Sequence, residues 1–222
     1  MTPEVSNAIL LFIVLLISIA LHEYGHAKSA DLLGDPLPRM QGRVTLNPMA
    51  HLDPIGSFLI PGINIFAQIM APGAPIMLGW GKPVSFDPRS FERQSRPALR
   101  ELTTVAAGPF MNLVQALVGA ILLACSAYWE PLGLLGAMVI RVNCALFVFN
   151  LMPIPPLDGS HFFRHIFGIS REAMAQWAMP GLIILLVIIN VPQARMLYIW
   201  PIQIMQLPFY QLGSLIYSFL VG

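Results

Sequence analysis

Five long apolar runs constrain the fold of this 222-residue chain more than any other feature of its sequence. A helix needs roughly 20 consecutive apolar residues to cross the hydrocarbon core of a bilayer. Runs of about this length cover residues 6–28, 102–128, 132–152, 177–193 and 196–220. Only 10% of the residues are charged, which is too few to cover the surface of a water-soluble protein. The sequence therefore predicts an all-α polytopic membrane protein.

A sixth apolar run, residues 55–78, is interrupted by glycine and proline. Such breaks free backbone groups that hydrocarbon cannot satisfy, which favours a kinked span or a re-entrant segment shielded by other helices. Lys and Arg in short loops collect on the cytoplasmic side. Three basic groups flank the apolar runs: Lys28, Arg39 and Arg43; Lys82, Arg89, Arg93, Arg96 and Arg100; and Arg164 and Arg171. If all three are cytoplasmic, the sixth run is re-entrant; in total we expect about five to six transmembrane helices.

Two histidines and a glutamate, His22, Glu23 and His26, lie inside the first apolar run. Each ionisable group at the centre of a bilayer costs roughly 2.5 to 3.5 kcal/mol on insertion scales. The spacing of four residues places the two imidazoles one turn apart on one helical face, where both can reach one cation. The pattern H-E-x-x-H on a helix is typical of zinc hydrolases, in which the glutamate takes a proton from water activated by the metal. We therefore expect a metal site in this span.

A second motif, Asn150 to Gly159, contains three prolines in four residues, so a helix must unwind there. Unwound backbone at membrane depth is tolerated where it lines a cavity. Under the expected topology, the first span and the span at 132–152 both run inward, which brings this segment to the depth of the two histidines. Asp158 could then supply the third protein ligand that a catalytic zinc needs. It could equally be the N-cap of a helix over residues 159–167.

Together the motifs resemble the site-2 protease family of intramembrane zinc metalloproteases. Residues 22–26, HEYGH, match the family's H-E-x-x-H, and residues 150–159 match its N-x-x-P-x-P-x-L-D-G element. Residues 108–112, GPFMN, resemble its G-P-x-x-N. The stretches 47–56 and 79–84 resemble loops of its small bacterial members. The likeness therefore extends over most of the first three quarters of the chain.

The resemblance implies a role for each of these residues. His22, His26 and Asp158 are expected to bind one zinc ion (Zn2+) per chain, and Glu23 to act as general acid and base. The implied reaction is hydrolysis of peptide bonds within or near the transmembrane helices of membrane-protein substrates, as in regulated intramembrane proteolysis. The implied location is the inner membrane of the cell, with the active site towards the cytoplasmic side.

The expected domain organisation is a single membrane-embedded metalloprotease domain over residues 1–222. Its catalytic core covers about 6–168, and its C-terminal helices about 177–220. No segment is long or polar enough to form the PDZ-like or CBS-like domain that many relatives carry. The first apolar run is too long for the apolar part of a signal peptide and itself carries the HEYGH motif, so we expect it to be retained.

An oxyanion formed during peptide hydrolysis needs a hydrogen-bond donor, and a neutral amide is suitable inside a bilayer. Asn150 and Asn112 are the candidates. Hydrogen bonding between helices is the alternative role for both. His161, three residues beyond Asp158, could supplement or replace the carboxylate on helical spacing. We expect instead that His161 and His165 lie solvated at the cytoplasmic interface.

A substrate helix hides its carbonyl groups in its own hydrogen bonds and must be unwound before it is cut. Residues 55–78 and the loop at 79–88 are the expected gates. The loop is predicted to form a short β-hairpin that pairs with extended substrate.

The alternative function is a zinc-binding membrane protein without protease activity, either a transporter or an inactive relative that binds helices. Glu23 favours the enzyme, because an ion carrier has no use for a carboxyl group that is not a ligand. The expected partners are a transmembrane substrate and the lipid bilayer, and the net charge of +1 gives no reason to expect nucleic acid. Cys125 and Cys144 are expected to pack as small apolar residues, with a disulfide between neighbouring helices as the alternative.

Overall fold

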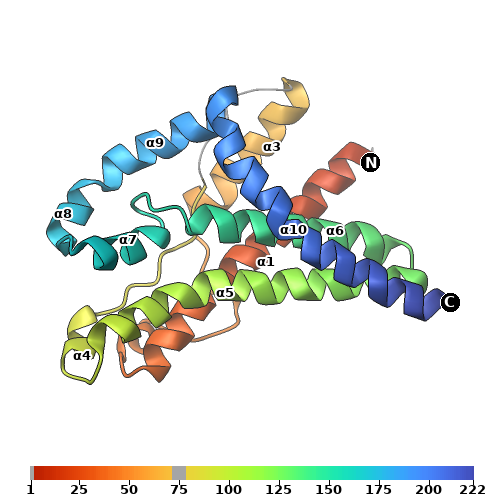
Figure 1. Ribbon diagram of the computed structural model, residues 1–222. Helices are drawn as coiled ribbons and strands as arrows, with labels where there is room; N and C mark the ends of the chain where they lie inside the picture. Colours follow the sequence, from red (N-terminus) through yellow and green to blue (C-terminus); the bar gives the residue numbers. More distant parts are fainter. Residues whose placement is uncertain (1–2, 72–78) are drawn as a thin grey trace.

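The computed structural model describes residues 3–71 and 79–222, and in these residues it contains helices and loops but no strand. The elements in chain order are α1 (Pro3–Leu32), α2 (Leu37–Met40), η1 (Pro48–Ala50), η2 (Pro54–Leu59), α3 (Ile60–Met70), α4 (Pro88–Glu92), α5 (Pro97–Ala124), η3 (Cys125–Ala127), α6 (Pro131–Asn150), α7 (Gly159–Phe167), α8 (Arg171–Gln176), α9 (Ala178–Asn190) and α10 (Pro192–Val221). Figure 1 shows the long helices α5, α6 and α10 lying along one another. The expected all-α class is confirmed.

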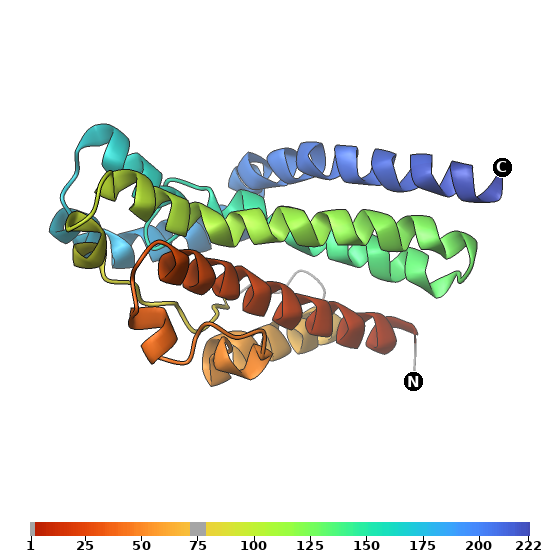
Figure 2. The same ribbon diagram turned by 90° about the horizontal axis from the view of Figure 1, so that it is seen from below.

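Helices α1, α5 and α6 form the centre of the molecule, and α10 covers α5 and α6 on the side away from α1 (Figure 2). Small side chains make this packing close, since Ala116 and Ala120 of α5 are fully buried against Ile140 and Cys144 of α6. Small residues at helix contacts let backbones approach closely, as is usual in membranes. Apolar side chains of α10, including Phe209, close this cluster. Cys144 therefore packs as the sequence predicts.

Within residues 3–71 and 79–222, four helices are long and apolar enough to cross a membrane: Val5–Leu32, Pro97–Ala127, Pro131–Asn150 and Pro192–Val221. Two shorter apolar helices cover Pro54–Ala67 and Ala178–Asn190. The expected count of five to six spans is therefore not confirmed. The run expected at 177–193 contains α9, whose 13 residues extend about 20 Å, less than the roughly 30 Å of the hydrocarbon core.

The outer surfaces of the long helices are apolar, as a lipid environment requires. On α1, Ile9, Ile13 and Ile17 follow one another at a spacing of four residues, and each is about half exposed. The turn between α5 and α6 carries the exposed aromatic residues Tyr128 and Trp129. Aromatic side chains of this kind are enriched where membrane meets water.

The described part of the expected re-entrant run, residues 55–71, is almost entirely helical. The Asp53 carboxylate accepts hydrogen bonds from the backbone N–H groups of Ile55 and Gly56, which starts η2, a π-helix that continues into α3. Pro61 lies in the first turn of α3, directly after η2, and does not interrupt the helix. Residues 72–78, on which the re-entrant interpretation also depends, lie outside the described residues.

Residues 79–87 form an extended segment that leads from beside the junction of η2 and α3 to α4. The β-hairpin expected at 79–88 is not present in the described part of the chain, because this segment has no partner strand there. Instead its backbone bonds to loops and side chains. Trp80 N–H donates to Gly56 O (3.0 Å), and Lys82 N–H donates to His51 O (2.9 Å).

Candidate active site

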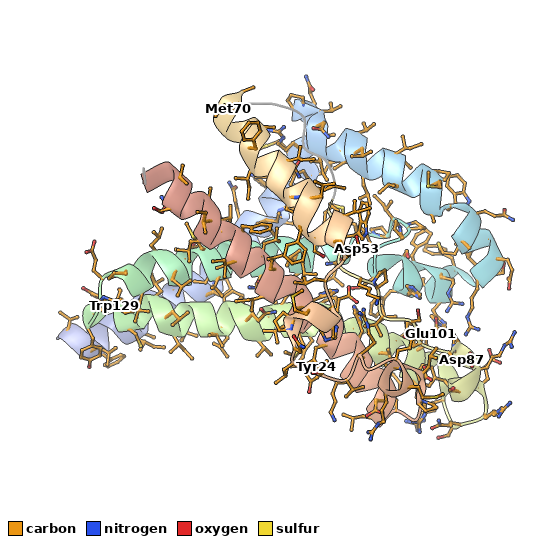
Figure 3. All side chains as sticks on the ribbon, turned by 180° about the vertical axis from the view of Figure 1, so that it is seen from behind. Tyr24, Asp53, Met70, Asp87, Glu101 and Trp129 are labelled. Atoms are coloured by element: carbon orange, nitrogen blue, oxygen red, sulfur yellow. The ribbon has the colours of Figure 1, made fainter. Side chains whose placement is uncertain are left out.

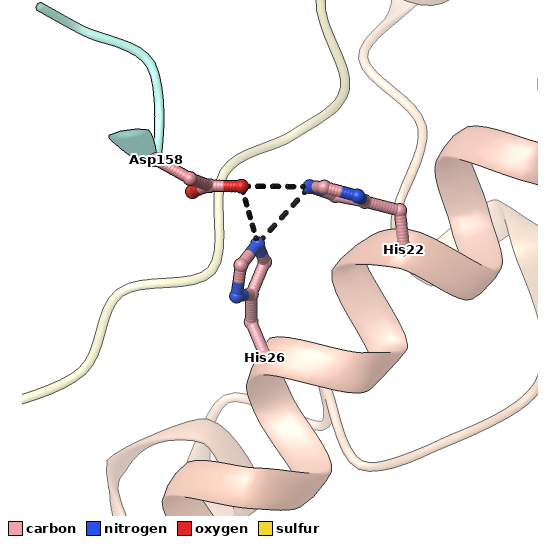
Figure 4. Close-up of side chains that lie close together, drawn as sticks. All are labelled: His22, His26 and Asp158. Atoms are coloured by element: carbon pink, nitrogen blue, oxygen red, sulfur yellow. Dashed lines mark hydrogen bonds and ion pairs between the residues drawn. The ribbon is translucent and has the colours of Figure 1, made fainter. Parts of the chain in front are cut away.

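Three side chains from two distant segments meet at the cytoplasmic end expected for α1. His22 and His26 project from one face of α1, and Asp158 approaches from the loop that precedes α7 (Figure 4). The two Nε2 atoms lie 3.1 Å apart. Asp158 Oδ2 lies 3.2 Å from His22 Nε2 and 3.3 Å from His26 Nε2. These three residues form the one candidate group of metal ligands within residues 3–71 and 79–222.

Helix α5 orients both imidazole rings through their other nitrogen. His26 Nδ1 lies 2.9 Å from Thr104 O, and His22 Nδ1 lies 2.7 Å from Asn112 Oδ1. A backbone carbonyl can only accept a hydrogen bond, so His26 Nδ1 carries the hydrogen and Nε2 presents its lone pair. Ligating histidines usually donate their second N–H to such a partner, which fixes the ring.

The geometry fits a bound cation. Two imidazole nitrogens and a carboxylate oxygen face one another, and buried Asp158 Oδ2 has no hydrogen-bond partner among the described residues. Both histidines are buried, with 6% and 7% of their surface exposed. Gly108 of α5 leaves the room that this cluster needs, because a Cβ atom there would lie 2.2 Å from His26 Nε2. Two nitrogens and one oxygen, with a fourth position open, form a donor set typical of catalytic zinc.

The sequence left open whether Asp158 is a ligand or an N-cap. It stands at the N-cap position of α7, but its side chain makes no capping hydrogen bond. The carboxylate points to the imidazoles instead (Figure 4). The turn before it is tight, since a Cβ atom on Gly159 would lie 2.2 Å from Leu151 O. Only glycine fits there, and this lets α7 begin directly behind the carboxylate.

Glu23 lies beside the histidines and faces a cavity of about 360 Å³. Its Oε2 atom accepts a hydrogen bond from the backbone N–H of Val84 (3.0 Å), in the extended segment 79–87. The cavity is also lined by His22, His26 and Asp158. A carboxylate and a candidate metal group therefore share one cavity, as hydrolysis by activated water requires.

The two asparagines occupy different places. Asn150 lines the cavity, and its Nδ2 donates one hydrogen bond to Leu146 O (3.0 Å). Asn112 is fully buried beneath His22, and its Nδ2 donates to Asn143 Oδ1 (3.0 Å). The Asn112 amide therefore bonds to His22 through its oxygen and to Asn143 through its nitrogen, so both of its ends have partners inside the protein.

The second pair of histidines surrounds a carboxylate that the sequence analysis missed. Glu101 of α5, only 3% exposed, receives hydrogen bonds from Arg164 and from Arg171 (3.0 Å to the latter). His161 Nδ1 lies 3.5 Å and His165 Nε2 lies 3.4 Å from its oxygens. Burial and the nearby Arg164 guanidinium lower the pKa of His165. An acid directly before the apolar run at 102–128 was the signal available in the sequence.

These contacts fasten α7 to α5 just beyond Asp158. His161 lines the cavity but is not among the candidate ligands of the described residues, so the structure gives it a place at the edge of the site. Its contact with Glu101 replaces the fully solvated position that we expected.

Taken together, the fold and the site define a polytopic membrane protein with a candidate metal centre of hydrolase type. The family model described as Peptidase family M50 matches residues 126–189, the part that contains Asp158. A protein of Bacillus subtilis (strain 168), YwhC, is 34% identical over 202 residues, which cover 86% of this chain and 84% of that protein. The chain therefore belongs to peptidase family M50, the site-2 protease family.

More distant relatives agree. The Rip2 proteins of Mycolicibacterium smegmatis (strain ATCC 700084 / mc(2)155) and Mycobacterium tuberculosis (strain ATCC 25618 / H37Rv) are 29% and 30% identical over 187 and 184 residues. The aligned part covers 80% of this chain and 65% of each Rip2 protein. All three relatives are named "Putative zinc metalloprotease". No solved structure matches the chain.

Proposed function

We propose that this metalloprotease-family chain is an intramembrane zinc endopeptidase that cuts within or near the transmembrane helices of other membrane proteins. One observation carries the proposal. Two imidazole nitrogens and the Asp158 oxygen converge without a hydrogen-bond partner for that oxygen, and Glu23 lines the same cavity among apolar helices. We propose that residues 1–222 form one domain with its catalytic core at 6–168.

In this proposal His22, His26 and Asp158 hold one zinc ion. When bound, the ion would polarise the peptide carbonyl and lower the pKa of water in the site. Glu23 accepts the proton of that water and later gives it to the leaving amine. Since Oε2 of Glu23 already accepts the Val84 N–H, Oε1 is the oxygen available for the proton.

Asn150 is the proposed donor to the oxyanion. One hydrogen of its Nδ2 group is used by Leu146 O, which fixes the amide, and the second hydrogen is available at the cavity wall. A fixed neutral donor stabilises developing negative charge without a reorganisation penalty.

The extended segment 79–87 is the proposed platform for an unwound substrate. The N–H groups of Trp80, Lys82 and Val84 all bond to the body of the protein. Alternate residues of an extended chain direct their backbone groups to opposite sides. Gly81 and Ser85 therefore present the other edge, where a substrate strand can add.

A lateral route from the lipid supports an intramembrane substrate. A second cavity of about 220 Å³ is lined by apolar residues of α1, with Pro61, Asn64 and Ile65 of α3. It shares Ile19, Gly79 and Leu146 with the cavity at the candidate metal centre. A helix in the membrane could thus reach the site between α1 and α3.

The orientation in the membrane is also a proposal. The helices α4, α7 and α8, which carry Arg89, Arg164 and Arg171, lie at the end of the molecule where α1 finishes (Figure 2). Figure 3 shows Asp87 and Glu101 at this charged end and Trp129 at the opposite end. The positive-inside rule assigns the charged end, and the candidate site near it, to the cytoplasmic side of the inner membrane.

Glu23→Gln tests the proposed reaction. The variant keeps the three proposed ligands, so the purified protein should hold as much zinc as wild type. Cleavage of a reconstituted transmembrane substrate should fall by a factor of about 100 or more, because the general base contributes 10²–10⁴-fold. The measurements are metal content by elemental analysis and cleavage by mass spectrometry.

Asp158→Asn is the companion variant and should lose zinc as well as cleavage. A wild-type protein that holds zinc but cuts no transmembrane substrate would favour the alternative, a zinc-binding membrane protein without protease activity. Equal turnover by wild type and Glu23→Gln would reject the assignment of Glu23.

A further inference from the structure

Asn143 is a buried amide in the middle of α6 that belongs to none of the sequence motifs. It is 0% exposed and lies among three helices. Its Nδ2 donates to Ser18 Oγ of α1 (3.0 Å) and to Val139 O of α6 (3.0 Å). Its Oδ1 accepts from Asn112 Nδ2 of α5 (3.0 Å). All of its hydrogen-bonding atoms are therefore engaged inside the protein, one step from the residue that contacts His22.

The hydrogen bonds of Asn143, Asn112 and His22 form a series, and the direction of each one follows from the last acceptor, Val139 O. Val139 O is a backbone carbonyl and can only accept, so the NH₂ group of Asn143 must face it. The carbonyl oxygen of Asn143 then faces Asn112, which must present its own NH₂ group. Asn112 Oδ1 is left facing the imidazole, so Nδ1 of His22 must carry the hydrogen.

This series of hydrogen bonds decides which ring nitrogen of His22 carries the lone pair. A neutral imidazole has one N–H and one lone pair. With the hydrogen held on Nδ1, the lone pair lies on Nε2, the atom 3.2 Å from Asp158 Oδ2. If the Asn112 amide were reversed, it would present N–H groups to Nδ1 and favour a hydrogen on Nε2. That tautomer cannot bind a metal through Nε2.

We propose that Asn143 is a positioning residue for the metal centre, because it fixes the Asn112 amide and through it the Nδ1–H tautomer of His22. The inference rests on the proposed zinc site. His26 provides an internal control, since a backbone carbonyl, Thr104 O, sets its tautomer directly. Loss of Asn143 therefore weakens the contribution of His22 and leaves His26 in place.

Asn143→Leu tests the proposal, with zinc affinity measured by competition with a chelator. Outer-shell partners of metal ligands typically contribute 10–100-fold to affinity, and we expect a fall in that range. Asn143→Asp should rescue binding to within about threefold. A buried aspartic acid stays protonated, so it can donate to Val139 O and accept from Asn112 as the amide does. Ser18→Ala should also stay close to wild type, because Val139 O still fixes the amide.

Nitrogen NMR of the cadmium-loaded protein, labelled with ¹⁵N-histidine, separates positioning from general loosening. In wild type, both His22 and His26 should show a hydrogen-bonded Nδ1–H and couple to ¹¹³Cd through Nε2. In Asn143→Leu, only the His22 signals should be lost or shifted. A change of both histidines together would mean that Asn143 acts only on the fold, and would overturn the proposal.

Two controls keep the outcome decisive. Asn143→Ala, which retains the helix propensity of α6, repeats the test if the leucine variant does not fold. Zinc affinity within about threefold of wild type in the folded variant, with His22 unchanged, would overturn the inference but leave the zinc site standing. A wild-type protein that binds neither zinc nor cadmium would overturn the proposed function itself.

Discussion

At the scale of single residues, the candidate metal centre depends on Gly108, because this residue has no side chain. The helix α5 passes directly behind the two imidazoles, and a Cβ atom at this position would lie 2.2 Å from His26 Nε2 and 2.7 Å from His22 Nε2. Real Cβ atoms do not approach other atoms so closely. The hydrogen atom of glycine thus leaves the Nε2 atoms free to face Asp158.

Gly108→Ala should therefore lower the affinity for zinc by about 100-fold or more, at or beyond the upper end of the effect of an outer-shell substitution. The methyl group occupies space that the ligand atoms need. Gly62→Ala in α3 is the matched control, because a Cβ atom there meets nothing within 4 Å. Chelator competition on both purified variants measures the difference. Equal zinc affinity for the two would contradict the geometry described for α5.

At the scale of elements, the sequence predicts helices better than it predicts which faces meet. The expected runs at 6–28 and 102–128 correspond to α1 and α5, because apolar length depends on local composition alone. The place of Asn112 beneath His22 depends on how α5 crosses α1 and α6, which no local pattern encodes. Asn143 was missed for the same reason, since a single amide in an apolar helix has no sequence signature.

The extended segment 79–87 illustrates the same limit. The sequence analysis predicted a hairpin here, whereas tertiary contacts hold the segment as a single extended chain against the loop before η2. The Arg43 guanidinium, only 3% exposed, donates to Ala50 O and to Lys82 O and so joins the two. His51 is fully buried in this junction, and its Nε2–H donates to Thr45 O (2.8 Å).

The contact between residues 79–87 and the loop before η2, which contains His51, should become less stable at acidic pH. Burial lowers the pKa of His51 from its ordinary 6.5; neighbouring Arg43 lowers it further, while Thr45 O and Glu23 act in the opposite sense. As the pH falls below 6.5, the unfolded chain takes up a proton that the folded junction resists. The free energy of unfolding therefore falls with pH until the folded pKa is passed.

His51→Gln is the matched variant, because its amide keeps the donor to Thr45 O and does not titrate. Thermal unfolding between pH 8 and pH 5 should show a larger loss for wild type than for this variant. The difference between the two removes the contribution of other titrating groups. Parallel curves would show that His51 does not control the junction.

At the scale of the whole molecule, two cavities lie next to each other along α1. The apolar cavity between α1 and α3 shares the lining residues Ile19, Gly79 and Leu146 with the cavity at the candidate metal centre. The proposed path of a substrate leads from the lipid through these two cavities to the Asp158 carboxylate. The apolar cavity is bounded by α1, by α3 and by Leu146 of α6.

Leu15→Trp should obstruct this path, since Leu15 lines the apolar cavity and an indole would fill much of its 220 Å³. We expect cleavage of a transmembrane substrate to fall by about tenfold, equivalent to roughly 1.4 kcal/mol in the barrier, while zinc content stays unchanged. Ile13→Trp is the control, because Ile13 is 46% exposed on the outer face of α1. Equal cleavage rates for the two variants would exclude the path between α1 and α3.

The hydrogen bonds from both imidazoles of α1 to α5 limit which helices can move. His26 bonds to Thr104 O and His22 bonds to Asn112, so a shift of α1 along α5 would break these bonds and reorient both rings. We therefore expect any movement that admits a substrate to take place on the other flank of α1, in α3 and residues 79–87, while α1, α5 and α6 keep their relative positions.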